Sequence, residues 1–155
     1  QFALCAKQAK EENYMIPMQT GDSITGVSLK IVRGTKDQGF VDIMFRGEMM
    51  GKVAASFQAK ENGISGMIAT DDPDTRELLA DYMGMFAEAL GEDSDEAVDV
   101  SVAYVKDLDL SNYRHTTETT ETKSPVQTRR LYHIAESFLS TVKEFVSDRY
   151  EIAPR

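Results

Sequence analysis

The sequence predicts an α+β domain: an antiparallel sheet of four to five strands with one packed helix over residues 73–90, and an additional C-terminal helix over residues 125–150. Three observations lead to this fold class. Apolar and polar residues alternate in several short stretches, as in half-buried strands. An Asn-Gly pair joins two of these stretches, and this pair is typical of a tight hairpin turn. Two longer amphipathic segments each begin with a proline, which favours the first position of a helix.

The N-terminal residues give the weakest pattern. Residues 1–12 contain helix-forming residues and a thin apolar stripe, which favour a short helix. Residues 13–20 are extended in character, and Pro17 would confine them to a sheet edge or to the position before a strand. We therefore treat residues 1–20 as an N-terminal extension and residues 21–110 as the α+β core.

Four stretches of the core alternate, and they are residues 24–33, 40–46, 52–60 and 64–70. The side chains expected to face the interior are Val27, Leu29, Ile31, Val41, Ile43, Phe45, Val53, Ala55, Phe57 and Ala59, with Asp42 pointing outward. Asn62-Gly63 suits a type I′ turn, which needs positive φ at both central positions. The third and fourth stretches are therefore expected to pair antiparallel.

The helix over residues 73–90 has clear start and stop signals. Asp72 supplies an N-cap oxygen, Pro73 occupies the first helical position, and Gly91 is placed to end the helix. Its expected apolar face comprises Leu78, Leu79, Tyr82, Met83, Phe86 and Leu90. A last strand follows, with Val98, Val100, Val102 and Tyr104 expected to face inward.

A polar, threonine-rich linker spans residues 111–124 and precedes the appended helix, in the segment 125–155. Ser124-Pro125-Val126-Gln127 has the form of a capping box. The apolar stripe of this helix comprises Leu131, Ile134, Phe138, Leu139, Val142, Phe145 and Val146. It is expected to cover the remaining apolar face of the core, to dock on the same sheet, or to pair with another copy.

Composition and charge argue against some classes of ligand. The net charge is −9, and residues 61–99 hold 12 acidic groups against one basic group, Arg76. This charge argues against nucleic acid as the ligand, because phosphate binding needs clustered Lys and Arg. The acidic surface is either a solvated face or a docking face for a basic partner. No apolar run approaches the roughly 20 residues of a bilayer span.

Enzyme chemistry has no recognisable form in the sequence. One cysteine, Cys5, and two histidines cannot build a zinc cluster, and the lone cysteine fits a reducing compartment. His133 and Glu136 share one side of the C-terminal helix, where solvated residues are the common case. The string Asp93-Ser94-Asp95-Glu96 lacks the Gly and Glu of a calcium loop. We expect no enzyme activity, no metal and no cofactor.

The segments Met50-Gly51-Lys52-Val53 and Thr75-Arg76-Glu77-Leu78-Leu79 flank a hairpin that contains a glycine. In order and spacing, residues 40–105 resemble the C-terminal domain of flagellar hook-length control proteins, whose pattern is Leu-Gly-x-Val-x-Val, a hairpin and an Arg-x-x-Leu helix opening. The chain departs from that family at Gly47-Glu48-Met49, where a Pro-Glu pair is usual, and the helix over residues 125–150 has no counterpart.

The resemblance implies a protein of a bacterial flagellum or a related type III secretion system. Such a module acts in the cytoplasm or is exported, and contact with the export gate switches which substrates leave the cell. We place the contact at Glu48, Met49, Met50 and Gly51, with Met49 and Met50 exposed at a turn. Most other methionines are expected to fill the core. The alternative is a structural domain that assembles through its C-terminal helix, so a monomer and a weak homo-oligomer are both open.

Overall fold

The computed structural model describes residues 11–20, 23–33, 39–47, 50–60, 63–90, 97–110 and 125–150. Six strands form one sheet in chain order, namely β1 (Glu11–Thr20), β2 (Ser23–Arg33), β3 (Gly39–Gly47), β4 (Gly51–Lys60), β5 (Gly63–Thr70) and β6 (Ala97–Tyr104). β1 to β5 are a meander of antiparallel neighbours, and β6 is parallel to β5. The α+β class is therefore confirmed, with six strands rather than four or five.

The edge strand β1 lies within the predicted N-terminal extension, residues 1–20. Pro17 lies in this strand, at the sheet edge where proline is tolerated. Glu11 and Glu12 also belong to the strand. The short helix expected over residues 1–12 otherwise falls outside the described residues.

The expected hairpin is present, with a shift of one residue at its turn. β4 and β5 pair antiparallel, and Lys60 lies opposite Gly63. Gly63 is therefore the first residue of β5 rather than a residue of the turn. The turn residues themselves lie outside the described part of the chain.

The single helix expected over residues 73–90 is two helices, α2 (Pro73–Ala80) and α3 (Met83–Leu90). Asp72 caps α2 as expected, because its side chain accepts a hydrogen bond from the Asp74 backbone N–H. At the break, the N–H groups of Asp81 and Tyr82 donate to the carbonyls of Leu78 and Leu79, three residues back. This tighter spacing redirects the chain, so that α2 packs on β5 and β6 while α3 also packs on α4.

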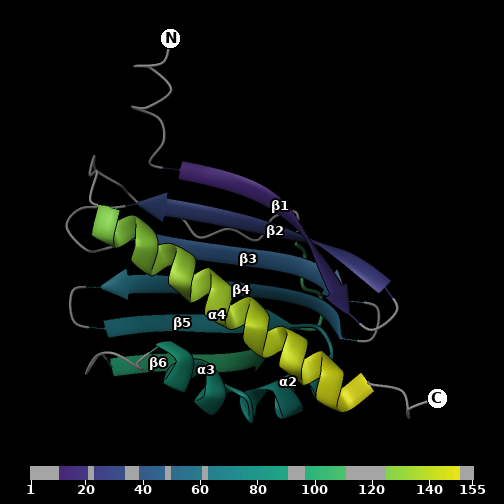
Figure 1. Ribbon diagram of the computed structural model, residues 1–155. Coiled ribbons are helices and arrows are strands. Elements are labelled where there is room, and N and C mark those ends of the chain that lie inside the picture. The colour runs from purple at the N-terminus through teal and green to yellow at the C-terminus, as the bar shows by residue number, and fades with distance from the viewer. Residues whose placement is uncertain are drawn as a thin grey trace.

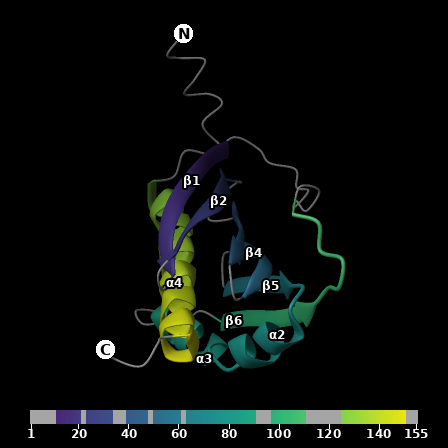
Figure 2. The ribbon, with the colours of Figure 1, turned by 90° about the vertical axis from the view of Figure 1, so that its right-hand side faces the viewer.

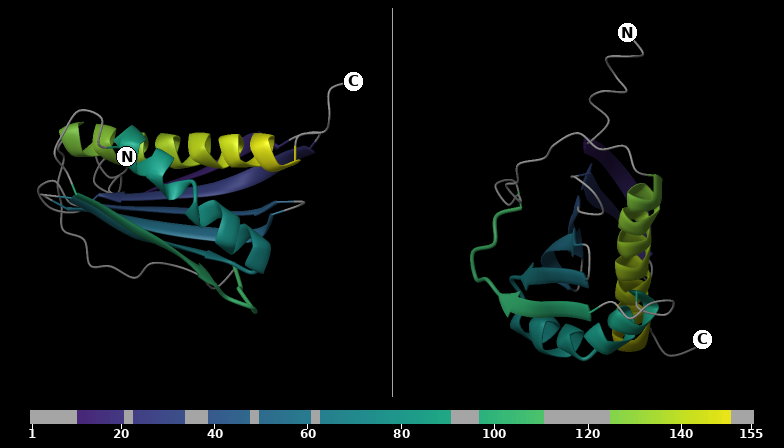
Figure 3. Two further views of the ribbon diagram at one scale, coloured as in Figure 1. Left: turned by 90° about the horizontal axis from the view of Figure 1, so that it is seen from below. Right: turned by 90° about the vertical axis from the view of Figure 1, so that its left-hand side faces the viewer.

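The long helix α4 (Pro125–Tyr150) lies diagonally across the same face of the sheet (Figure 1). Seen from the side, α3 and α4 cover one face, while residues 105–110 follow the other (Figure 2). The buried residues of α4 are Leu131, Ile134, Phe138, Val142, Phe145 and Val146. Of the three positions expected for this helix, the structure therefore confirms docking on the same sheet. Views from below and from the opposite side show α4 and α3 side by side (Figure 3).

The core between sheet and helices contains the predicted inward residues of β2, β3 and β4, all of them buried. The rings of Phe57, Phe86 and Phe138 join β4, α3 and α4, with centroids 5.1 to 5.8 Å apart. The burial of two residues differs from what the sequence predicts. Asp42 lies on the opposite face but is buried, accepting a hydrogen bond from Ser56 Oγ. Tyr104, at the end of edge strand β6, is exposed rather than inward.

Candidate functional site

The predicted contact turn comprises Glu48, Met49, Met50 and Gly51. Glu48 and Met49 lie outside the described residues. Met50 is 2% exposed and belongs to the core. Its carbonyl accepts a hydrogen bond of 3.0 Å from the Thr75 hydroxyl. The exposure predicted for Met50 was therefore wrong, since its side chain packs inward.

Gly51 has a structural reason for being glycine. Its φ is +82°, and a Cβ at this position would lie 2.6 Å from the carboxylate oxygen Oδ1 of Asp71. That same oxygen accepts a hydrogen bond from the Lys52 N–H, and the Asp71 N–H donates back to the Lys52 carbonyl. The start of β4 and the entry to α2 are thus fastened together at one corner of the domain.

A groove lies between α3 and α4 on the described surface. Its volume is about 420 Å³, within the range of known ligand sites. It is lined by Met85 and Ala89 from α3 and by Glu136, Ser137, Ser140, Thr141 and Glu144 from α4. Small side chains on both helices leave this space open, because they do not fill the gap between the backbones.

Two contacts with α4, one from α3 and one from the turn before α3, border the groove. At one end, a ring nitrogen of His133 lies 3.2 Å from the Ala89 carbonyl oxygen. At the other end, the Tyr82 hydroxyl donates to Asp148 Oδ2 at 2.6 Å, and the Tyr82 ring packs on Phe145. His133 and Asp148 are roughly 22 Å apart along the axis of α4, from the rise of 1.5 Å per residue.

The groove is acidic. Glu136 and Glu144 are exposed, and neither forms an ion pair or hydrogen bond with a residue that the structure describes. The hydrogen bond to Asp148, with burial and the negative charges of Asp148, Glu144 and Asp81, raises the pKa of Tyr82 to about 12. Asp148 and Glu144 of α4 and Asp81 of the turn before α3 therefore place negative charge at this end.

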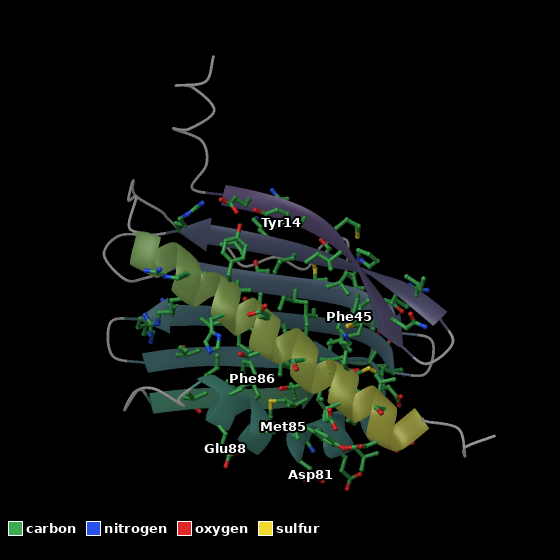
Figure 4. All side chains as sticks on the ribbon, in the orientation of Figure 1. Tyr14, Phe45, Asp81, Met85, Phe86 and Glu88 are labelled. Atoms are coloured by element: carbon green, nitrogen blue, oxygen red, sulfur yellow. The ribbon has the colours of Figure 1, made fainter. Side chains whose placement is uncertain are left out.

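Met85 gives the groove an apolar element. Its side chain is 44% exposed although it is large and hydrophobic. In the side-chain view it lies on α3 next to α4, with Phe86 turned toward the sheet (Figure 4). An exposed methionine beside exposed carboxylates offers a partner both apolar contact and charge.

A second polar cluster joins α4 to the edge strand β1. Glu12 accepts hydrogen bonds from the hydroxyls of Tyr14 and Tyr132 and pairs with Arg33 of β2. Burial raises the pKa of Glu12, but the two tyrosine hydrogen bonds and the charge of Arg33 outweigh it, so the pKa is lowered overall. Burial and the hydrogen bond to Glu12 raise the pKa of Tyr132. These groups bond to one another, so we interpret the cluster as a fastening between elements.

Two residues of the groove are candidates in the sequence, where nothing indicates that they face α3. His133 and Glu136 are exposed on α4, as expected, but they contribute to the border and lining of a groove. The acidic string of residues 93–96 lies outside the described residues. Among the methionines described, Met18 and Met50 are buried, Met44 and Met83 are partly buried, and Met15, Met67 and Met85 are exposed.

Within the described ranges, no group of three or more His, Cys, Asp or Glu side chains is placed to hold a metal ion. The helices of that same part of the chain include none with the length and apolar character needed to cross a membrane. Comparisons with protein-family models, with curated proteins and with solved structures find no match to this chain.

Proposed function

We propose that this chain is a non-enzymatic protein-binding domain that contacts the cytoplasmic domain of a type III export gate and thereby switches the substrates exported. It would work in the cytoplasm or after export through the same apparatus. The proposal depends on the resemblance of residues 40–105 to the hook-length control family.

One structural observation supports it. The two segments that carry the resemblance, residues 50–53 and 75–79, meet through the hydrogen bond from Thr75 to the Met50 carbonyl. The hairpin between them leads directly into the helix, and Lys52 and Asp71 are joined by two hydrogen bonds. Residues that match in order along the sequence therefore form one physical unit, as expected if the pattern preserves a fold shared with that family.

The alternative, assembly through the C-terminal helix, was motivated by the apolar stripe of that helix. The stripe packs against β1, β2 and β3 of the same chain and against α3, and all of its residues are buried except Leu139, which is partly buried. The stripe is therefore not available to a second copy in this structure, and we do not propose that alternative further.

Isothermal titration calorimetry with a purified export-gate cytoplasmic domain would test the proposal. We expect saturable binding by the full chain and none to an unrelated cytoplasmic domain of matched net charge. A strain that lacks this gene should fail to switch export substrates. Absence of binding, together with normal switching in the deletion strain, would reject the proposal.

A further inference from the structure

We infer that the groove between α3 and α4 is the docking surface of this domain, and that its occupant is a basic amphipathic helix of the partner protein. The inference depends on the proposed protein-binding function and identifies the surface and the chemistry of the contact. It is carried by the shape of the groove, by its charge and by its exposed methionine.

The shape suits a helix. The groove follows α4 between two contacts, one made by His133 of α4 with Ala89 of α3 and one made by Tyr82 of the preceding turn with Asp148 of α4. Ser140 and Ala89 line it with small side chains, so a helix could approach closely without displacing large groups. Placing an amphipathic helix in a groove is a recurrent mode of protein recognition.

The charge selects a basic occupant. Glu136 and Glu144 are eight residues apart on α4, which places them on one side at a separation of roughly 12 Å. A partner helix with Lys or Arg side chains seven or eight residues apart would match this separation. Among the residues that the structure gives as lining the groove, none is basic, so the two carboxylates have no competing cation there.

The apolar contact lies between the charges. Met85 and Ala89 line the groove from α3, opposite Ser140 of α4. A Leu or Met of the partner helix, halfway between its two basic residues, would cover Met85, whose flexible side chain adapts to varied partners. Complementary charge then sets the orientation, and apolar burial adds affinity.

The test uses the full chain and a synthetic 18-residue helical peptide of Leu, Ala and Lys, with Lys seven apart on one face and Leu between. A scrambled peptide of equal composition has the same charge without the pattern. The groove variant is Glu136→Gln with Glu144→Gln. The matched control is Asp74→Asn with Glu77→Gln, which removes the same charge from exposed positions on α2.

We expect the patterned peptide to bind at least tenfold more tightly than the scrambled peptide and to shift the Met85 methyl resonance. The groove variant should lose at least tenfold in affinity, and the control variant less than twofold. Equal binding of both peptides, or equal losses in both variants, would overturn the inference. Circular dichroism of each variant checks that the fold is intact.

The same variants separate this inference from the proposed function. If the export-gate domain does not bind but the patterned peptide binds in the groove, the proposed partner is wrong and the docking surface remains. If the gate domain binds wild type and the groove variant equally well, the proposed function remains and the docking surface is wrong.

Discussion

At the residue scale, Gly51 shows how one backbone conformation holds two elements together. Its positive φ brings the Gly51 backbone close to Asp71. The Asp71 side chain then accepts a hydrogen bond from the Lys52 N–H. Residues with a Cβ rarely adopt this backbone conformation. The sequence places this residue in a contact site, which stays a prediction, and the structure adds a positioning role for its backbone. Sequence alone could not separate these roles, because both favour a glycine at a turn.

Replacing Gly51 with Ala should destabilise the domain by about 1–3 kcal/mol, because the Cβ would combine backbone strain with a clash against Asp71. Gly84→Ala is the matched control, since a Cβ at Gly84 meets nothing within 4 Å. Because Gly84 lies inside a helix, Gly84→Ala should raise the free energy of unfolding by about 0.5–1 kcal/mol. Urea denaturation of both variants measures the free energies of unfolding. Equal effects of the two substitutions would contradict this account.

At the element scale, three strands were predictable because the side chains of β2, β3 and β4 that face the helices are all buried. The inward residues of β2, β3 and β4 alternate strictly with the outward ones, and this period identifies a strand. β1 was less clear because apolar residues lie on both of its faces: Met18 is buried, whereas Met15 is exposed. The period of two is therefore masked in the sequence, although Pro17 correctly indicated an edge.

The break between α2 and α3 could not be predicted from spacing. Apolar residues three and four positions apart occur both in a continuous helix and across a short turn with bonds to the third residue back. The deciding contact is tertiary, because Tyr82 turns toward Phe145 and Asp148 of α4, more than 60 residues later. The groove was missed for the same reason, since its two walls are far apart in the chain.

The fastening of α4 to β1 predicts a pH dependence. The lowered pKa of Glu12 means that its ionised form stabilises the fold above the unfolded-state pKa near 4.5, and that this stabilisation is lost as the pH falls through the folded-state pKa. Wild type should therefore be more stable than Glu12→Gln at pH 7, and the difference should shrink at pH 3. Urea denaturation at the two pH values gives the comparison. A difference that stayed constant between them would show that ionisation of Glu12 does not contribute.

At the scale of the whole molecule, the helix face of the sheet is covered by the chain's own helices. Phe57, Phe86 and Phe138 meet where β4, α3 and α4 converge, and all three are fully buried. The sequence indicated this architecture through the apolar stripe of α4, but it left three places for that stripe to dock. In the structure α4 packs against Phe57 and the neighbouring strands, so the stripe docks on the sheet of its own chain.

We therefore expect a monomer whose stability depends on α4. Light scattering should give the mass of one chain, and the urea midpoint should not change over a hundredfold range of protein concentration, because only oligomers gain stability with concentration. Phe138→Ala should lower the free energy of unfolding by about 3–5 kcal/mol. Ser140→Ala, at an exposed position on the same helix, should change it by less than about 0.5 kcal/mol. A midpoint that rises with concentration would indicate self-association.

The docking of α4 across β1, β2 and β3 also has a consequence for the order of folding. A ribosome makes Glu11 first and Tyr150 last among these elements, so the strands emerge long before the helix that covers them. Contacts between segments about 120 residues apart close a long loop, whose entropic cost slows their formation. During synthesis, the apolar face of the meander is therefore exposed until α4 has been made. We expect a chaperone to bind the nascent chain in this interval, because exposed apolar surface favours aggregation.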